Sequence, residues 1–320
     1  MSKIISTYDA DPSDEQRSKW QKEQEELRAR HETQDRLDFD PENLQEIKYI
    51  AGVDLSFPPG DEENAVACLV VLSMPDLKIV YKQFLETKLY LPYIPGFLAF
   101  REVEPLLKLI KELKINQPEF YPQVILVDGN GLLHPRQFGI ASHLGVLSDL
   151  PTIGIAKTFL RIPGELDNVS EIKNEYKKVL KKKGDYMNLI GTESSTTYGC
   201  ALRTSDNAIN PVFVSQGHRI SLQTSIKVVL ALCPQYRIPE PIRAADLETT
   251  ETFEAINSRP VRMIVNNDTA ERRRIQKQPR SSDRDDILDQ SYKDAQTSLV
   301  NDTDTVGGKE VPEEHESQMR

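Results

Sequence analysis

The sequence is poor in cysteine and has no long run of apolar residues. Its three cysteines, Cys68, Cys200 and Cys233, are odd in number and far apart, which excludes a disulfide scaffold and a four-cysteine zinc site and favours a reducing intracellular setting. The apolar run Cys68–Leu72 is only as long as a strand, whereas a bilayer-spanning helix needs about 20 residues. The first residues contain no apolar signal region, so we expect neither secretion nor a membrane partner.

Basic residues are also fewer than acidic ones. The 320 residues include 40 Lys and Arg against 50 Asp and Glu, and the net charge is −10. Most of the acidity lies at 1–45, with 7 basic and 12 acidic groups, and at 265–320, with 9 and 13, so that 46–264 has a net charge of only −1. A near-neutral middle is compatible with a nucleic-acid partner, because a local basic groove matters more than total charge.

Hydrophobic periodicity predicts strands first and helices between later strands. Three strands at 47–57, 65–74 and 78–89 are joined by short turns, which is typical of an antiparallel meander. A helical period follows at 97–115, where Pro105 predicts a kink or a break. The continuously apolar segment 123–127 is typical of a strand covered on both faces. We then expect a helix at 137–149, a strand at 153–156, a polar Lys-rich insertion at 157–185, a hairpin of 196–203 and 211–215, and a helix at 221–233.

The two ends of the chain are less regular. A solvent-facing helix is predicted at 13–37, with Ser13 at its start and only Trp20, Leu27 and a few side-chain stems available for burial. At 265–320 only 12 of 56 residues are hydrophobic and no period is visible, so we expect a disordered acidic tail after a domain at 1–264. The element order predicts an α/β fold, with a mixed sheet of three antiparallel strands followed by parallel strands, flanked by helices.

Two aspartates stand out in the predicted strands. Asp54 lies inside the apolar strand GVDLSF, and Asp128 ends the apolar strand QVILVD before the turn DGNG. If the two strands are neighbours, the carboxylates meet, and both stay ionised only if a cation lies between them. Oxygen ligands of this kind suit Mg²⁺ or Mn²⁺. Alone, Asp54 would be a turn cap and Asp128 an Asx-turn residue; together they favour a metal site.

Other polar residues carry a weaker signal. Glu102 is by default a solvent-exposed helix glutamate. A lone loop histidine is usually a surface residue or a partner in a turn hydrogen bond. His134 and His218 both flank short glycine-containing segments between core elements, which strengthens the case for a function and leaves both interpretations open. Lys157 directly follows the strand IGIA, where it could hold a phosphate or a nucleophilic water, or could extend its stem along the surface with its charge in solvent.

The segment LPYIPG at 91–96 is unusual because two prolines enclose Tyr93 and Ile94. The prolines stiffen the loop, and we expect it to present the aromatic and the branched side chain outward. A rigid exposed aromatic can stack on a base or insert between two bases, at about 1–3 kcal/mol per base. A turn whose tyrosine packs on the core is an equally good interpretation of the sequence.

Together these segments resemble the endonuclease V family of inosine-specific nucleases. The similarity lies in GVDLSF, PYIPGFLAFRE, the long block from VDGNG to IGIAK, SQGHRISL and RIPEPIRAAD, which occur in the family's order. The wording of GFLAFRE and RIPEPIR is closer to the eukaryotic branch. The resemblance implies a ribonuclease H-like fold and a nuclease domain at 1–264.

The resemblance also implies roles for single residues. Asp54, Glu102 and Asp128 would be metal ligands, and His218 a ligand or an acid–base partner near a second metal position. Lys157 would support the scissile phosphate or the attacking water, and Asp246 would be a further acidic member of the site. Tyr93 would be a wedge that fills the gap left by a flipped nucleotide. The other implied substrate-binding residues are Pro92, Ile94, Pro95, Gly96, Gly129, Gly131 and His134, the glycines letting main-chain groups approach hypoxanthine.

The activity implied by the resemblance is hydrolysis of the second phosphodiester 3′ of inosine, leaving a 5′-phosphate and a 3′-hydroxyl. The cofactor would be Mg²⁺, with Mn²⁺ able to substitute. The substrate would be single-stranded RNA, with DNA as a further substrate, and the enzyme a monomer of the cytoplasm and nucleus, including the nucleolus. The alternatives are a DNA-repair nuclease acting on deoxyinosine and a catalytically weak inosine-binding protein. A phosphoryl-transfer enzyme acting on nucleotides is disfavoured, since the sequence has neither a Walker loop nor a dinucleotide fingerprint.

Overall fold

The computed structural model describes residues 12–257, apart from positions 59 and 62. The tail predicted at 265–320 lies outside the described residues, so its disorder and the domain boundary remain predictions. In the described part, no helix is both long enough and apolar enough to cross a membrane.

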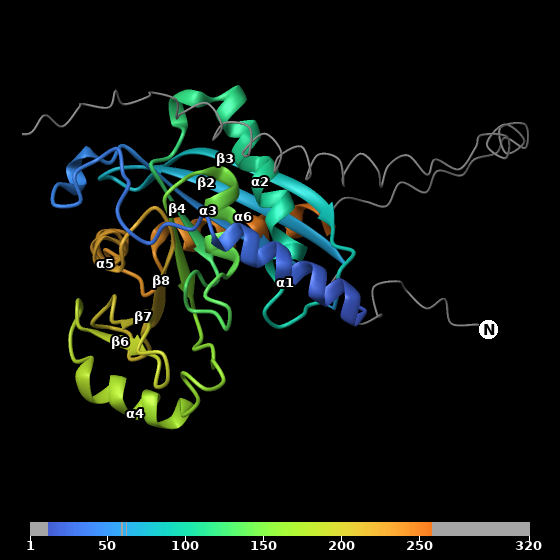
Figure 1. The fold of residues 1–320 in the computed structure, drawn as a ribbon. Coiled ribbons are helices and arrows are strands. Elements are labelled where there is room, and N and C mark those ends of the chain that lie inside the picture. Colours follow the sequence, from blue (N-terminus) through green and yellow to red (C-terminus); the bar gives the residue numbers. More distant parts are fainter. Residues whose placement is uncertain (1–11, 59, 62, 258–320) are drawn as a thin grey trace, which may run out of the picture. The chain divides into compact units, whose positions relative to one another are not determined.

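The centre of the described part is an eight-stranded mixed sheet, in the order β3-β2-β1-β4-β5-β8-β7-β6 (Figure 1). Strands β1 to β3 are antiparallel, β4 runs parallel to β1 and β5, and β8 runs antiparallel to β5. The predicted α/β class with a mixed sheet is therefore confirmed. The strands are β1 Tyr49–Ser56, β2 Asn64–Ser73, β3 Lys78–Lys88, β4 Val124–Asp128, β5 Thr152–Ala156, β6 Tyr186–Ile190, β7 Thr197–Leu202 and β8 Val212–His218.

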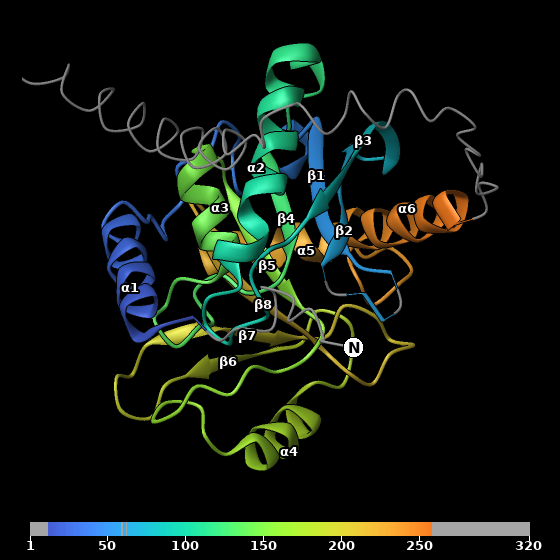
Figure 2. The same ribbon diagram turned by 90° about the vertical axis from the view of Figure 1, so that its right-hand side faces the viewer.

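Helices cover both faces of this sheet (Figure 2). On one face, α2 contacts β1, β2 and β3, and α3 contacts β4, β5 and β8; on the other, α6 packs on β1, β2 and β4. Alternate strand residues therefore face different helices, and Ile50 and Leu126 belong to the cluster that includes Ile242 of α6. The helices are α1 Asp14–Arg28, α2 Ala99–Asn116, α3 Ile140–Ser148, α4 Val169–Val179, α5 Leu222–Ala231 and α6 Glu240–Asn257, with short 3₁₀ turns at Leu44–Glu46 and Pro118–Phe120.

The N-terminal helix is shorter than predicted. Ser13 caps α1 by accepting a hydrogen bond from the Gln16 amide, and Trp20 and Leu27 are buried, as expected. The helix ends at Arg28, not at 37. Beyond it the main chain pairs with the residue after β8: Arg36 N donates to Arg219 O, and Arg219 N donates to Glu32 O. Because these bonds use the backbone groups that a longer helix would need, the helix stops.

The sequence had suggested a kink or a break at Pro105, but helix α2 is not broken there. It runs from Ala99 to Asn116 with Pro105 in its interior. The residues on either side, Val103, Leu106 and Leu107, are all buried, so packing of this helix outweighs the local cost of the proline.

Two regions contain elements that periodicity did not predict. The polar stretch 157–185 contains α4, which is capped by Asn168 and buries only Tyr176, and it leads directly into β6. The second is α6, which begins at Glu240 within the proline-containing segment RIPEPIRAAD. Pro241 occupies the first turn of α6, where a missing N–H has no consequence for helix hydrogen bonding.

Helix α6 lies in direct contact with β1 because Gly52 has no side chain. A Cβ at Gly52 would lie 2.1 Å from the carbonyl oxygen of Pro241. Any larger residue at position 52 would push α6 away from the sheet. The glycine thus sets how closely α6, which carries Asp246, approaches the strand that carries Asp54.

Candidate active site

Asp54 and Asp128 lie side by side at the ends of β1 and β4. The parallel register pairs Val53 with Val127. The residues that follow them, Asp54 and Asp128, therefore also lie on adjacent strands, which are about 4.8 Å apart. Asp54 is 9% exposed and accepts a hydrogen bond from Ser56 Oγ at 3.1 Å. Burial raises the pKa of Asp54 to about 6; the charges of Asp128 and Asp246 add to the rise, and Lys157 opposes it.

Glu102 lies in the first turn of α2 and belongs with the same carboxylates. Its side chain is half-buried rather than exposed, which corrects the default prediction for a helix glutamate. Burial raises the pKa of Glu102 to about 8; neighbouring Arg101 lowers it, and the charges of Asp54 and Asp128 raise it further. Glu102 is therefore within electrostatic reach of both aspartates, although it comes from a different face of the sheet.

Lys157 and Asp246 complete the cluster. Lys157 Nζ lies 2.8 Å from Asp128 Oδ2 and 3.4 Å from Asp246 Oδ2. Burial alone would lower the pKa of Lys157, but the hydrogen bond that its ammonium donates to Asp128, and the charges of Asp128, Asp246 and Asp54, raise this pKa overall, so the ammonium stays charged. Asp246 is supplied by α6, and the structure brings it to the position expected for a further acid.

His218 lies away from these carboxylates, contrary to its predicted role as a ligand or acid–base partner. Strand β8 runs antiparallel to β5, so His218 pairs with Thr152 at the start of β5, whereas Asp128 lies beside Ile155 near its end. The separation along the sheet is about 10 Å. The physical reason is the direction of β8: because it runs antiparallel to β5, it ends beside the start of β5.

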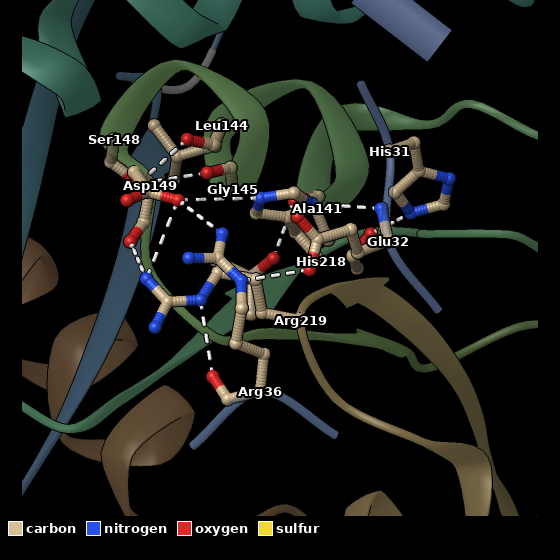
Figure 3. Close-up of polar contacts among 12 residues, drawn as sticks. His31, Glu32, Arg36, Ala141, Leu144, Gly145, Ser148, Asp149, His218 and Arg219 are labelled. Carbon is tan, nitrogen blue, oxygen red and sulfur yellow. Dashed lines mark hydrogen bonds and ion pairs between the residues drawn. The ribbon is translucent and has the colours of Figure 1, made fainter. Parts of the chain in front are cut away.

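The surroundings of His218 are structural (Figure 3). It is 3% exposed, its Nδ1 accepts a hydrogen bond from Glu32 N at 3.2 Å, and its Nε2 lies 3.8 Å from Asp149 Oδ1. Burial lowers the pKa of His218 to about 4, with a further lowering from His31 and an opposing effect of Glu32 and Asp149. The imidazole is thus neutral near pH 7 and joins the segment after α1 to the loop before β5.

The two large side chains of the proline-enclosed loop at 91–96 have opposite environments. Tyr93 is 61% exposed, as a wedge requires, but Ile94 is 5% exposed and points into the protein. The expectation that Ile94 is presented outward was therefore wrong. Pro92 is half-buried and Pro95 is exposed. The loop thus offers one aromatic ring to solvent and uses its branched residue as an anchor.

Tyr93 lines two neighbouring cavities. One, of about 420 Å³, lies between this loop and the turn after β4. The other, also about 420 Å³, is lined by Tyr93 together with Phe57 and Glu102. The exposed ring of Tyr93 thus borders both the first cavity and the cavity lined by Glu102, which is the arrangement that a wedge would need. The first cavity is lined by Gln24, Tyr93, Pro95, Gly96, Leu98, Ala99, Asn130, His134, Pro135, Arg136, Phe138, Gly139, Ile140, Leu160, Arg161 and Pro163.

Gly129 and Gly131 are absent from this lining, and their amides are already used. Gly129 N donates to Ile155 O at 2.9 Å, and Gly131 N donates to Ser215 Oγ at 2.9 Å. A Cβ at Gly131 would lie 1.9 Å from Gln216 O, so its glycine is required by backbone packing against β8. The prediction that these two glycines read a base is therefore corrected.

Gly96 and His134 do line the cavity and are bonded to each other. His134 Nδ1 accepts a hydrogen bond from Arg136 N at 3.2 Å, which leaves Nε2–H to donate to Gly96 O at 3.1 Å. Burial, and then the charge of Arg136, lower the pKa of His134 to about 4. His134 is neutral near pH 7 and holds the loop that carries Tyr93.

Comparison with known proteins assigns the chain to a family. A sequence model of endonuclease V matches residues 31–247. Human endonuclease V is 43% identical over 246 residues, covering 75% of this chain and 84% of the human protein. Mouse endonuclease V is 45% identical over 242 residues, covering 75% of this chain and 70% of the mouse protein. The chain belongs to the endonuclease V family.

Solved endonuclease V structures have the same fold. The catalytic domain of human endonuclease V superposes with a TM-score of 0.73 at 42% identity, covering 77% of this chain and 99% of that one. Endonuclease V of Ciona intestinalis, bound to DNA containing an inosine followed by a ribo-adenosine, superposes with a TM-score of 0.72 at 40% identity, covering 77% and 100%. The chain is accordingly an endonuclease that acts on phosphodiester bonds, and the predicted family and fold are confirmed.

Endonuclease V enzymes are metal-dependent nucleases in general, and the donor set of this chain fits a divalent ion. Asp54, Glu102 and Asp128 offer only oxygen, which Mg²⁺ and Mn²⁺ prefer. Burial and mutual charge raise the pKa values of Asp54 and Glu102, and a divalent cation would relieve that repulsion. Within residues 12–257 as described, no three His, Cys, Asp or Glu side chains are already arranged around a metal-sized position.

Sequence reasoning missed several residues of this endonuclease V site. Gln24, Arg136 and Arg161 line the cavity but lie in segments without an obvious pattern. Arg136 could have been found, because it follows His134 in the block GLLHPRQFG. Gln24 carried no signal, since it is one of several glutamines in a polar helix.

The first prediction concerns Glu102 without metal. In the folded protein the pKa of Glu102 is raised to about 8. Its protonated form therefore contributes to the free energy of unfolding, fully below the ordinary pKa of a glutamate, and this contribution is lost as the pH rises through 8. In EDTA, Glu102→Gln should therefore match wild type near pH 4.5 and melt several degrees higher at pH 9. Thermal unfolding across this range measures the effect, with exposed Glu119→Gln as the control. Equal melting temperatures at pH 9 would refute the buried-charge description.

The second prediction separates His218 from Asp246. His218→Ala should lower the melting temperature because it empties a buried position, while kcat for nuclease turnover stays within about twofold. Asp246→Asn should keep the melting temperature and lower kcat about 100-fold, because Lys157 loses its second carboxylate partner. Turnover at saturating substrate and thermal unfolding of both variants test this pair. A 100-fold loss in His218→Ala with an intact fold would return His218 to the active site.

Proposed function

We propose that this endonuclease V hydrolyses the second phosphodiester 3′ of inosine in single-stranded RNA, with DNA as a further substrate, using Mg²⁺ or Mn²⁺. The observation that carries the proposal is the pair of cavities that share Tyr93. One is lined by Asn130 and His134, and we call it the base-sized cavity because we assign the flipped base to it; the other is lined by Glu102. With the base in the first cavity, the strand passes Tyr93 and reaches the carboxylates.

The chemistry of the base-sized cavity supports hypoxanthine. Asn130 lines this cavity, and its Oδ1 atom is buried and accepts no hydrogen bond from the described residues. Hypoxanthine carries an N1–H donor, whereas adenine has an acceptor at N1, so a turn of the Asn130 side chain that brings Oδ1 to the cavity would favour the deaminated base. Guanine shares the N1–H but adds an exocyclic amine, which a closed wall would crowd or leave unpaired.

One observation supports a ribonucleotide beside the inosine. Endonuclease V of Ciona intestinalis was captured on a DNA in which an inosine is followed by a ribo-adenosine. Extrusion of a base costs a few kcal/mol in a duplex and least in a single strand, so unpaired inosine is the easier substrate.

In the proposed reaction each residue of the cluster has a part. Asp54, Glu102 and Asp128 would hold a divalent ion, which lowers the pKa of a water and stabilises charge on the phosphate. Asp246 and Asp128 fix the Lys157 ammonium, and this charge faces the pentacovalent phosphate as its negative charge grows. Tyr93 stacks in the gap left by the extruded base and keeps the strand in register.

The test is cleavage of matched single-stranded oligomers that differ at one position, as inosine, adenosine or guanosine, in RNA and in DNA. We expect cleavage of the inosine strand at its second 3′ phosphodiester with Mg²⁺ and none with EDTA, and a higher kcat/KM for RNA. Asp128→Asn serves as the matched inactive protein. Binding of inosine without cleavage would favour an inosine-binding protein, and equal cleavage of all three strands would contradict the proposed selectivity.

A further inference from the structure

Gln24 is the polar residue among the three buried side chains of α1, beside Trp20 and Leu27. It is 1% exposed and lies one turn before the end of the helix. Its Nε2 donates to Gly96 O at 3.2 Å and to Phe138 O at 3.4 Å, and its Oε1 accepts from Arg136 Nε at 2.6 Å. One amide therefore connects the loop that carries Tyr93 with the loop that follows β4, and Gln24 itself lines the base-sized cavity.

Gly96 O is the point where these contacts meet. Besides Gln24, it accepts hydrogen bonds from His134 Nε2, at 3.1 Å, and from Arg136 Nη2. Gly96 has φ +83°, a conformation that favours glycine, and it closes the proline-enclosed loop directly before α2. Fixing this carbonyl fixes the end of the loop, and with it the position of Tyr93 three residues earlier.

Helix α1 is anchored over the same region. Trp20 packs on Phe97 and Phe100, with ring centroids 5.6 and 5.3 Å apart. Arg28 Nη2 donates to Gln137 Oε1 at 2.7 Å. The family model begins only at residue 31, so α1 lies before the residues that it matches, whereas the residues that α1 contacts lie within them.

We propose that α1 is part of the substrate site, and that Gln24 is a positioning residue that clamps the loop at 91–96 against the turn at 134–138. The inference rests on the proposed function, because it takes the base-sized cavity as the inosine site. Gln24 does not contact the reacting phosphate. Its side chain fixes the carbonyl of Gly96 by a hydrogen bond, and the position of Gly96 fixes that of Tyr93 in the same loop. The clamp keeps the loop in the conformation that receives the flipped base, so that substrate binding does not have to select a rare conformation.

The chemistry explains why the residue is glutamine. The clamp needs two N–H donors for the carbonyls of Gly96 and Phe138 and one acceptor for Arg136, and only an amide side chain offers both at this length. Methionine has nearly the same length and packs in its place, but it neither donates nor accepts as an amide does. Gln24→Met therefore removes the hydrogen bonds and keeps the packing.

The experiment compares wild type with Gln24→Met, with Gln21→Met as the matched control one turn away on the exposed side of α1. Four measurements are made: the kinetics on a single-stranded inosine RNA, which give KM and kcat; hydrogen–deuterium exchange of the peptide at 91–97; tryptophan fluorescence; and thermal unfolding. Trp20 is the only tryptophan of the chain, so its emission reports whether α1 stays docked on Phe97 and Phe100.

We expect Gln24→Met to raise KM about tenfold with kcat nearly unchanged, as for the loss of one or two hydrogen bonds outside the reacting centre. Exchange at 91–97 should become faster while Trp20 emission stays at the wild-type wavelength, and Gln21→Met should match wild type. Unchanged KM and exchange would overturn the clamp. So would a joint loss of kcat and melting temperature with red-shifted Trp20 emission, because α1 would then only stabilise the fold. If wild type does not cleave inosine RNA, the proposed function fails, and exchange at 91–97 still decides the clamp.

Discussion

The structure depends on a set of carboxylates held close together, of which Asp54 is buried and Glu102 and Asp128 are half-buried. Asp54, Glu102, Asp128 and Asp246 converge from two strands and two helices, and the Lys157 ammonium lies between Asp128 and Asp246. Burial and mutual repulsion raise the pKa values of Asp54 and Glu102, so keeping both groups ionised costs free energy. Such an arrangement destabilises the empty protein near neutral pH and prepares it for a divalent cation and a phosphate.

The rest of the fold holds this cluster in place. The register of β1 and β4 sets the two aspartates side by side, and the missing side chain of Gly52 lets α6 bring Asp246 over them. A hydrogen bond of 2.9 Å between Ser56 and Thr249 joins the end of β1 to the same helix. On the other side, the loop before α2 carries Tyr93 and leads into the first turn of α2 with Glu102, so the proposed wedge and the proposed metal ligand belong to one continuous segment.

Local patterns predicted every strand except β6, most helices and the meeting of Asp54 with Asp128, because these follow from hydrophobic period and from parallel pairing. They failed where strand direction or packing in three dimensions decides. His218 ends a strand that runs antiparallel to β5, which places it at the other ends of the strands from Asp128, and a glycine is needed at position 131 because β8 passes close to it. Ile94 and Gln24 were both expected at the surface, but both are buried, and only tertiary contacts show this.

The most direct test of the central claim is calorimetric titration of Mg²⁺ into the metal-free protein at pH 7, in buffers with different ionisation enthalpies. Glu102 has a pKa of about 8 and is therefore mostly protonated at this pH, so a cation bound by Asp54, Glu102 and Asp128 must displace its proton. We predict release of about one proton per bound ion in wild type and none in Glu102→Gln. Binding without proton release, or no binding, would contradict the claim that these carboxylates form the metal site.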